Sequence, residues 1–215
     1  MSDSGESVDD LDVSVAPDEK SAPDDREFTG PLDETEATAV RPYVDLGGIK
    51  IIPRDGLHLR LEVEEETQRI VAIGLDYANS TLQVQPFAAP RSTGLWHEIR
   101  SQIAEQVRAQ GGRVSEHEGV FGAELLAEIP VAAPAGAPGE TRVARFIGVD
   151  GPRWFLRGVV AGEAVAKPET AALIEDLFRS IVVVRGDSPM PPRDLIPLRM
   201  PVDSEAPADR GFSTL

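Results

Sequence analysis

The side chains able to carry out chemistry are few and scattered in this sequence. Histidine occurs only at positions 58, 97 and 117, and none of these has the spacing of a helical metal-binding pair with a glutamate base. We interpret all three as surface residues, and Glu64–Glu66 and the pair Glu116 and Glu118 as solvated turn and strand positions. The sequence therefore predicts no metal site and no cofactor.

Catalytic nucleophiles are missing from the sequence pattern as well. The chain has no cysteine, which excludes a disulfide scaffold, a thiolate zinc site, an iron–sulfur cluster and a cysteine nucleophile. No Gly-x-Ser-x-Gly elbow occurs, and Gly47-Gly48 precedes an expected strand rather than a phosphate-binding helix. No catalytic residue is predicted.

One group of arginine and aromatic residues surrounds the dipeptide Asp150-Gly151, which is typical of a tight two-residue hairpin turn. Strand alternation on both sides of that turn separates two faces. One face is apolar and is expected to belong to the core. The other face could bind a protein or an acidic ligand, and its candidate binding residues are Arg142, Phe146, Arg153, Phe155 and Arg157.

Three interpretations of this arginine and aromatic face remain open. In the first it is exposed and binds a partner. In the second a helix covers it, with the arginine stems over the rings and their charges paired with Asp and Glu. In the third the acidic N-terminal arm folds back onto it. Arg145 lies on the otherwise apolar face and does not fit the predicted arrangement.

The alternative candidate is a pocket between the sheet and the helix expected at 93–110. Trp96 and His97 could contribute to such a pocket. It would make the protein a small-molecule-binding protein or an enzyme of unfamiliar type, a different class from a protein-binding module.

Two helices are predicted by apolar residues at helical spacing. The first contains Leu95, Ile99, Ile103 and Val107, with Ser92 or Thr93 as its cap. The second opens at Lys167-Pro168, where proline is tolerated in the first turn. The other segments alternate as strands, and a last, continuously apolar strand at 181–184 is expected to be central. The order predicts an α+β domain, a mostly antiparallel β-sheet flanked by two main helices in an α/β/α sandwich.

Acidic residues are concentrated in residues 1–40, which hold 13 Asp and Glu against Lys20 and Arg26. This segment is expected to be a disordered acidic tail, serving either as an arm for a basic partner or as a solubilising leader. Residues 41–186 are expected to form a single α+β domain. Residues 187–215 are a Pro-rich extended C-terminal tail, and four apolar side chains in it are expected to pack onto the domain rather than onto another protein: Leu195, Ile196, Leu198 and Met200.

The overall charge limits the partners that we expect. The chain has 21 Lys and Arg against 37 Asp and Glu, a formal net charge of -16, which opposes general nucleic-acid binding. No apolar run reaches the roughly 20 residues needed to cross a bilayer, and the first residues lack the pattern of a secretory signal. We expect a soluble, cytoplasmic protein whose partner is another protein, without nucleic acid or membrane.

Three stretches resemble an actinobacterial family of uncharacterised proteins, domain of unknown function 3710. They are Tyr43–Ile49, Gly94–Arg100 and Gly148–Trp154, the last continued by Leu156-Arg157-Gly158. The resemblance covers residues 40–200 and implies a cytoplasmic protein of high-GC Gram-positive bacteria, but no activity and no site residue. The element order is also similar to the Mog1 and PsbP sandwiches, a likeness of fold that favours an interaction role.

The sequence thus predicts a non-enzymatic binding or regulatory protein. Its expected interaction surface is the arginine and aromatic face around Asp150-Gly151, where Phe146, Phe155, Arg153 and Arg157 are the anchors. The acidic arm is expected to tune the encounter with the partner.

Overall fold

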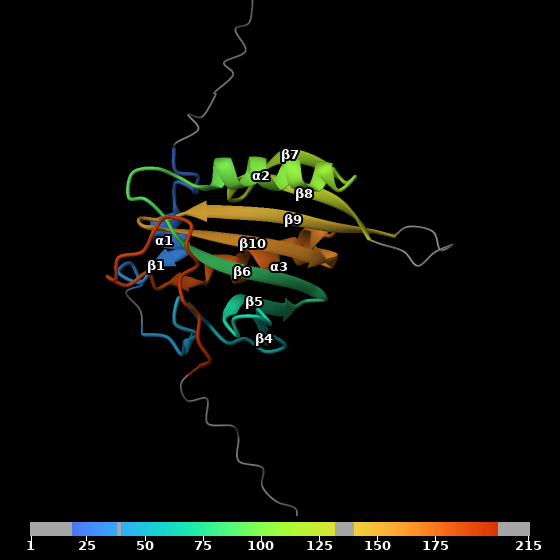
Figure 1. Cartoon of the computed structure of the whole chain (residues 1–215). Coiled ribbons are helices and arrows are strands. Elements are labelled where there is room, and N and C mark those ends of the chain that lie inside the picture. The colour runs from blue at the N-terminus through green and yellow to red at the C-terminus, as the bar shows by residue number, and fades with distance from the viewer. Residues whose placement is uncertain (1–18, 38–39, 132–139, 202–215) are drawn as a thin grey trace, which may run out of the picture.

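A computed structural model of the chain describes residues 19–37, 40–131 and 140–201. Its middle layer is a seven-stranded sheet in which every neighbouring pair is antiparallel, and one long helix packs on each face, as Figure 1 shows. The predicted α+β sandwich is confirmed. In spatial order the strands are β4 (His58–Val63), β5 (Ile70–Tyr77), β6 (Ser80–Ala88), β10 (Trp154–Gly162), β9 (Glu140–Asp150), β8 (Gly122–Val131) and β7 (Arg113–Gly119).

Helix α3 (Pro168–Arg179) covers one face of the large sheet and begins at proline, as predicted. The main core lies between them, where Leu177 and Phe178 pack with Leu156 and Val160 of β10. A short 3-10 helix, Glu163–Val165, connects β10 to α3. Burial of this apolar stripe is the chief force that holds α3 against the sheet.

A second, four-stranded sheet packs against the same core. Its order is β1-β11-β3-β2. Strand β11, the last strand of the chain, therefore has a neighbour on both sides, as its apolar sequence predicts. The pairing of β1 with β11 is parallel, and the other two are antiparallel. The strands are β1 (Leu32–Asp33), β2 (Val44–Asp45), β3 (Ile49–Ile51) and β11 (Val182–Val183).

Helix α2 (Trp96–Ala109) covers part of the opposite face of the large sheet. Its predicted cap is wrong, because neither Ser92 nor Thr93 closes the helix and the residue at the cap position is Leu95. The acceptor comes from Asp150 instead, whose carboxylate receives hydrogen bonds from the amides of Leu95 (2.8 Å) and Trp96 (3.3 Å). A residue far away in the sequence thus satisfies the first helical donors.

The hairpin between β9 and β10 has a longer loop than predicted. The predicted two-residue loop would pair Phe155 with Phe146, whereas in the structure Phe155 pairs with Asp150, four positions further along β9. Because this shift is an even number of residues, the predicted division into two faces survives. Gly151 is required for space, since a Cβ there would lie 2.1 Å from the Trp154 ring.

The prediction of disorder for residues 1–40 is wrong for residues 19–37, while residues 1–18 lie outside the described residues. Residues 19–37 include α1 (Arg26–Thr29) and β1, and they pack along the domain. Ser21 exchanges hydrogen bonds with Asp150, through its amide (3.0 Å) and its carbonyl (2.8 Å). Arg26 pairs with Glu36 at 2.5 Å, so charged residues that suggested a solvated tail are paired with each other.

The C-terminal segment is extended and packs onto the domain, as predicted, over its described part, residues 187–201. Leu195 pairs with Phe87 at the end of β6, and Leu198 pairs with Gly47. Ile196 is buried in the main core, whereas Met200 remains exposed. The segment therefore bridges the large and the small sheet. Residues 202–215 lie outside the described residues.

Candidate functional site

Phe155, one of the five predicted binding residues, is a core residue. It is fully buried under α2, where its ring stacks on Trp96 at 5.8 Å and on Phe87 at 6.0 Å. Helix packing rather than partner binding therefore accounts for this aromatic side chain. As an anchor for a partner, Phe155 was predicted wrongly, because the sequence pattern alone does not show which part of the face a helix covers.

Helix α2 leaves the rest of that face uncovered. It contacts β7, β8 and β9, while β6 and β10 run on beyond it with no helix in front of them in Figure 1. The strand registers place Arg157 opposite Gln85, and Val159 between Gln83 and Phe146. We call this half-buried surface the open face, and it consists of Gln83, Gln85, Phe87, Phe146, Arg157 and Val159.

Arg157 lies at the centre of the open face. Its guanidinium donates to the side-chain carbonyl of Gln85 and stands 5.7 Å from the ring centre of Phe87. No carboxylate of a described residue lies within 4.0 Å of it, and its Nε is buried without a hydrogen-bond acceptor. Burial lowers the pKa of the Arg157 guanidinium, which nevertheless stays protonated.

The two remaining predicted residues lie at the margins of this surface. Arg142 is exposed on β9, on the same side of the sheet as Phe146. Arg153 belongs to the β9–β10 loop and donates to the carbonyl of Gly186 (3.2 Å), with Asp187 at 3.5 Å. Of the five predicted residues, the structure therefore brings Phe146 and Arg157 together and keeps Arg153 at the C-terminal segment.

Gln83, Gln85 and Phe87 were not predicted as part of a binding surface. Their alternation with Leu82, Val84 and Pro86 shows in the sequence that they share one side of a strand. Nothing local shows that this strand lies beside β10, a pairing that joins residues 80–88 to residues 154–162. The missing signal is long-range pairing.

The alternative pocket between the sheet and α2 is filled by side chains. Trp96 is fully buried, and its indole N–H donates to the carbonyl of Ala123 at 2.6 Å. Ile103, Ala104 and Val107 of the same helix pack with Leu125 and Ala127 of β8. His97 is only half-buried at the helix start. Trp96 therefore belongs to the core and does not line a pocket there.

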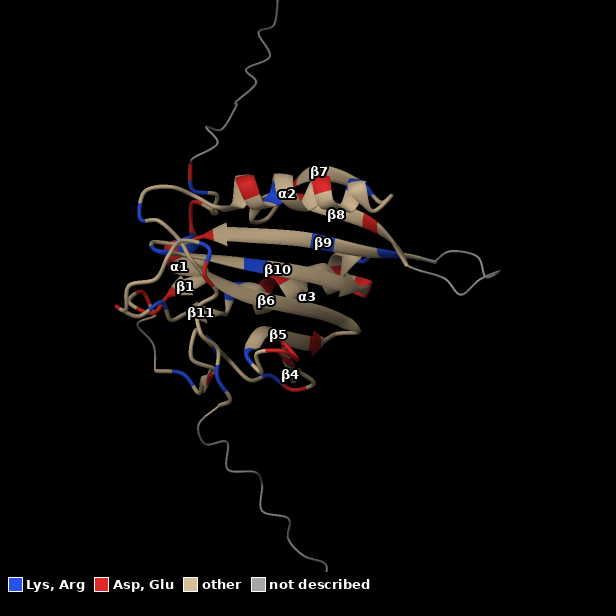
Figure 2. Ribbon diagram, viewed as in Figure 1, with Lys and Arg blue, Asp and Glu red and all other residues tan. Residues whose placement is uncertain are grey.

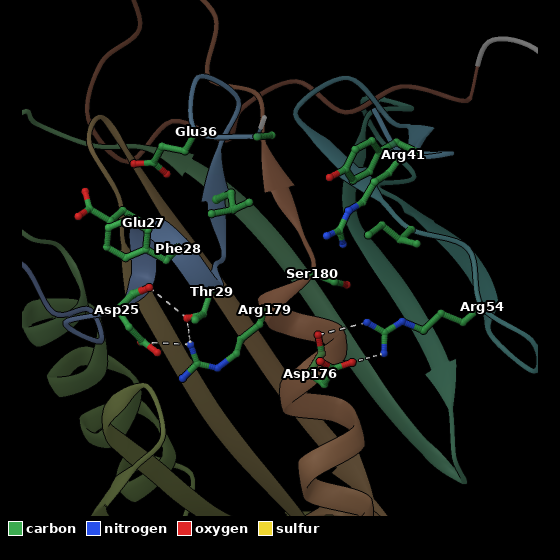
Figure 3. A pocket seen from close by; sticks show the side chains of 14 residues that line it. Asp25, Glu27, Phe28, Thr29, Glu36, Arg41, Arg54, Asp176, Arg179 and Ser180 are labelled. Atoms are coloured by element: carbon green, nitrogen blue, oxygen red, sulfur yellow. Dashed lines mark hydrogen bonds and ion pairs between the residues drawn. The ribbon is translucent and has the colours of Figure 1, made fainter. Parts of the chain in front are cut away.

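A groove of about 1230 Å³ lies elsewhere, between the N-terminal segment and the end of α3. Figure 3 shows Asp25, Glu27, Phe28 and Thr29 on one side of it and Arg41 and Arg54 on the other. Two ion pairs build its walls, Arg54 with Asp176 at 2.6 Å and Arg179 with Asp25 at 3.4 Å. No sequence motif indicated this groove, since its lining comes from three separate stretches of chain.

A buried ion cluster explains Arg145, which did not fit the predicted apolar face. Its guanidinium bonds to Glu124 at 2.6 Å and to Glu175 at 2.5 Å, and Glu124 is almost fully buried. Burial opposes the charge on Arg145, but the hydrogen bonds and charges of the two glutamates outweigh it and raise the pKa of the guanidinium. His117 lies 3.6 Å from Glu124 at the edge of this cluster.

Charge is unevenly distributed around the open face. Figure 2 shows that basic positions interrupt β9 and β10, whereas α2 carries residues of both signs.

Across the residues that the structure describes, no group of three or more His, Asp and Glu is arranged to hold a metal ion. None of the described helices is long and apolar enough to span a bilayer.

The chain has similarity to a solved structure and to a protein family. The solution structure of cyanobacterial PsbP (CyanoP) from Synechocystis sp. PCC 6803 matches with 12% sequence identity and a TM-score of 0.38, over 72% of this chain and 99% of that chain. A comparison with curated proteins finds no match. The model of the family described as protein of unknown function (DUF3710) matches residues 30–206. Since this match spans most of the sequence, the chain belongs to that family.

Proposed function

We propose that the protein is a binding module that holds an extended segment of another protein on its open face. The observation that carries this proposal is the half-buried guanidinium of Arg157, which has no carboxylate partner among the described residues. A buried charge that is not paired is costly to a folded protein. A ligand carboxylate that reaches Arg157 would relieve that cost, since arginine binds carboxylates through two parallel N–H groups.

Other arginines of the chain support this interpretation of Arg157. Arg145 is paired with two glutamates, and Arg54 with Asp176, although the second pair lies at the surface. The formal net charge of -16 means that carboxylates are abundant. Two partly buried arginines of the described residues nevertheless lack a carboxylate within 4.0 Å, Arg157 and Arg185. Arg185 donates to the backbone carbonyl of Ser188 close by in the sequence (2.9 Å), whereas Arg157 donates to the Gln85 side chain in the middle of the sheet, where burial lowers its pKa.

The neighbours of Arg157 define the chemistry of the partner segment. Phe87, Phe146 and Val159 offer half-buried apolar surface around the guanidinium. The matching segment carries one Asp or Glu flanked by apolar side chains, and the net negative charge of the chain favours a partner that is otherwise basic. The same charge supports a protein rather than a nucleic acid as the partner.

A displayed library of random peptides of about a dozen residues tests this proposal. Selection on the full chain is expected to enrich peptides with an acidic residue between apolar ones. Arg157→Gln removes the charge and is expected to weaken a selected peptide by at least about tenfold, the worth of one charge-assisted hydrogen-bonded contact.

Arg69→Gln is the matched control, because Arg69 is exposed at the β4–β5 turn and makes no ion pair with any described residue. It should leave the affinity unchanged. Selected peptides that lack acidic residues, or that bind the Arg157→Gln protein as tightly as the wild type, would refute the proposal. Thermal melts of both variants show that each is folded.

A further inference from the structure

The groove beside α1 has an exposed aromatic side chain on its rim. Phe28 is 80% exposed, the most exposed aromatic residue of the described chain. Its backbone is nevertheless held firmly, because the amides of Phe28 and Thr29 both bond to the carbonyl of Asp25, at 3.0 and 2.9 Å. The hydroxyl of Thr29 also accepts a hydrogen bond from Arg179 of α3. Phe28 thus projects an exposed apolar ring from a backbone that hydrogen bonds hold in place; we call this ring the knob.

The charges that line the groove are mostly paired within the chain. Asp176 is bonded to Arg54, Asp25 to Arg179, and Glu36 to Arg26. Two lining charges form no ion pair with a described residue, Glu27 and Arg41. Figure 3 shows them on opposite sides, with Glu27 beside Phe28 and Arg41 facing them across the opening. On opposite walls of the groove, one charge of each sign is thus left without an ion pair among the described residues.

We propose that a second copy of this chain occupies the groove, in a symmetric dimer in which Phe28 of each copy inserts into the groove of the other. A two-fold interface needs one patch that carries both a knob and the space to receive it. Phe28 supplies the knob, and the groove has apolar lining from Leu32, Tyr43 and Ile52. If the two-fold axis passes between these two walls, it also brings Glu27 of each copy to Arg41 of the other.

The unpaired charges favour a second copy over an unrelated ligand. A purely acidic or purely basic ligand would satisfy one wall and meet a like charge on the other, which is unfavourable. The wall of an identical chain carries Glu27 where Arg41 needs an acid, and Arg41 where Glu27 needs a base. This proposal does not depend on the open face, which lies on another side of the large sheet.

Sedimentation equilibrium of the full chain over a range of concentrations tests the dimer. Wild type is expected to dimerise reversibly, and Phe28→Glu to weaken association by about 100-fold or more, because each dimer loses two central aromatic contacts. Val143→Glu is the matched control, since Val143 is an exposed apolar residue of β9 outside the groove. It should dimerise like the wild type.

Charge exchange identifies the contact itself. Glu27→Arg and Arg41→Glu should each dimerise poorly alone, because like charges then meet across both copies. In a mixed dimer of the two variants both contacts again join opposite charges, so an equimolar mixture should dimerise about as tightly as the wild type. A monomeric wild type at about 100 μM, well above the dissociation constants of specific interfaces, would overturn the proposal. So would a Phe28→Glu protein that still dimerises, or mixed variants that stay monomeric while both remain folded.

Discussion

Replacing Asp150 by alanine is expected to lower the free energy of unfolding by about 3 kcal/mol. The carboxylate of this buried residue accepts hydrogen bonds from three amides, those of Ser21, Leu95 and Trp96, at 2.8 to 3.3 Å. It therefore joins the N-terminal segment, the start of α2 and the β9–β10 hairpin. Alanine leaves all three donors without this acceptor, and those of Leu95 and Trp96 are buried, whereas that of Ser21 is partly buried.

The magnitude follows from two opposing effects. Each unsatisfied buried amide costs about 1 to 3 kcal/mol. Burial, however, raises the pKa of Asp150 above its ordinary value despite these hydrogen bonds, so the charged carboxylate is itself disfavoured in the fold. Removing that unfavourable charge offsets part of the loss, which leaves the lower end of the range, about 1 kcal/mol for each amide.

Urea unfolding followed by circular dichroism measures the change, and the melting temperature should fall by about 6 to 12 °C. Asp187→Ala is the control, because Asp187 is fully exposed and its nearest charge, on Arg153, lies 3.5 Å away. It should change stability by less than about 0.5 kcal/mol. Asp150→Asn keeps one acceptor oxygen and should fall between the two. If Asp150→Ala unfolds with the same midpoint as Asp187→Ala, the carboxylate does not join these segments.

Two further predictions concern packing and pH. Gly148→Ala should destabilise by about 2 kcal/mol in urea unfolding, because its Cβ would lie 2.4 Å from the rigid Trp96 ring. Gly74→Ala should be nearly neutral, because its Cβ would meet only the side-chain ends of Arg60 at 3.1 Å and Glu62 at 3.4 Å. Hydrogen bonds from Arg60 and Thr81 lower the pKa of Asp76 in the fold, so the stability that it contributes is present above the ordinary aspartate pKa and is lost as the pH falls through the lower folded value. An NMR titration of Asp76 with a midpoint at or above the ordinary value would contradict this.

Local patterns in the sequence were sufficient for the two long helices, α2 and α3, and for the faces of the strands. The apolar spacing from Leu95 to Val107 reports burial within a few turns, and α2 forms there. Likewise, alternation in β9 and β10 assigns each side chain to the correct face even though the loop length was wrong. Both inferences depend only on neighbours in sequence.

Contacts between distant segments could not be predicted in the same way. The segment 19–37 reads as an acidic tail by composition, yet it packs on the domain because Asp150, Ile181 and Val183 lie where its backbone can bond to them. Composition averages over the segment, whereas a few specific hydrogen bonds determine whether it is ordered. The groove was missed for the same reason, since its walls are assembled from the N-terminal segment, the β3–β4 connection and the end of α3.

The ion cluster around Arg145 links the fold to the proposed binding surface. Arg145 and Phe146 are consecutive in β9, so they point to opposite faces of the sheet. Glu124 and Glu175 hold the guanidinium of Arg145 on the face that α3 covers. A slip of one residue in β9 would turn Arg145 away from both glutamates and leave the buried Glu124 without its arginine, which is strongly unfavourable. The cluster therefore selects one orientation of β9, and that orientation places Phe146 on the open face beside Val159, near Arg157.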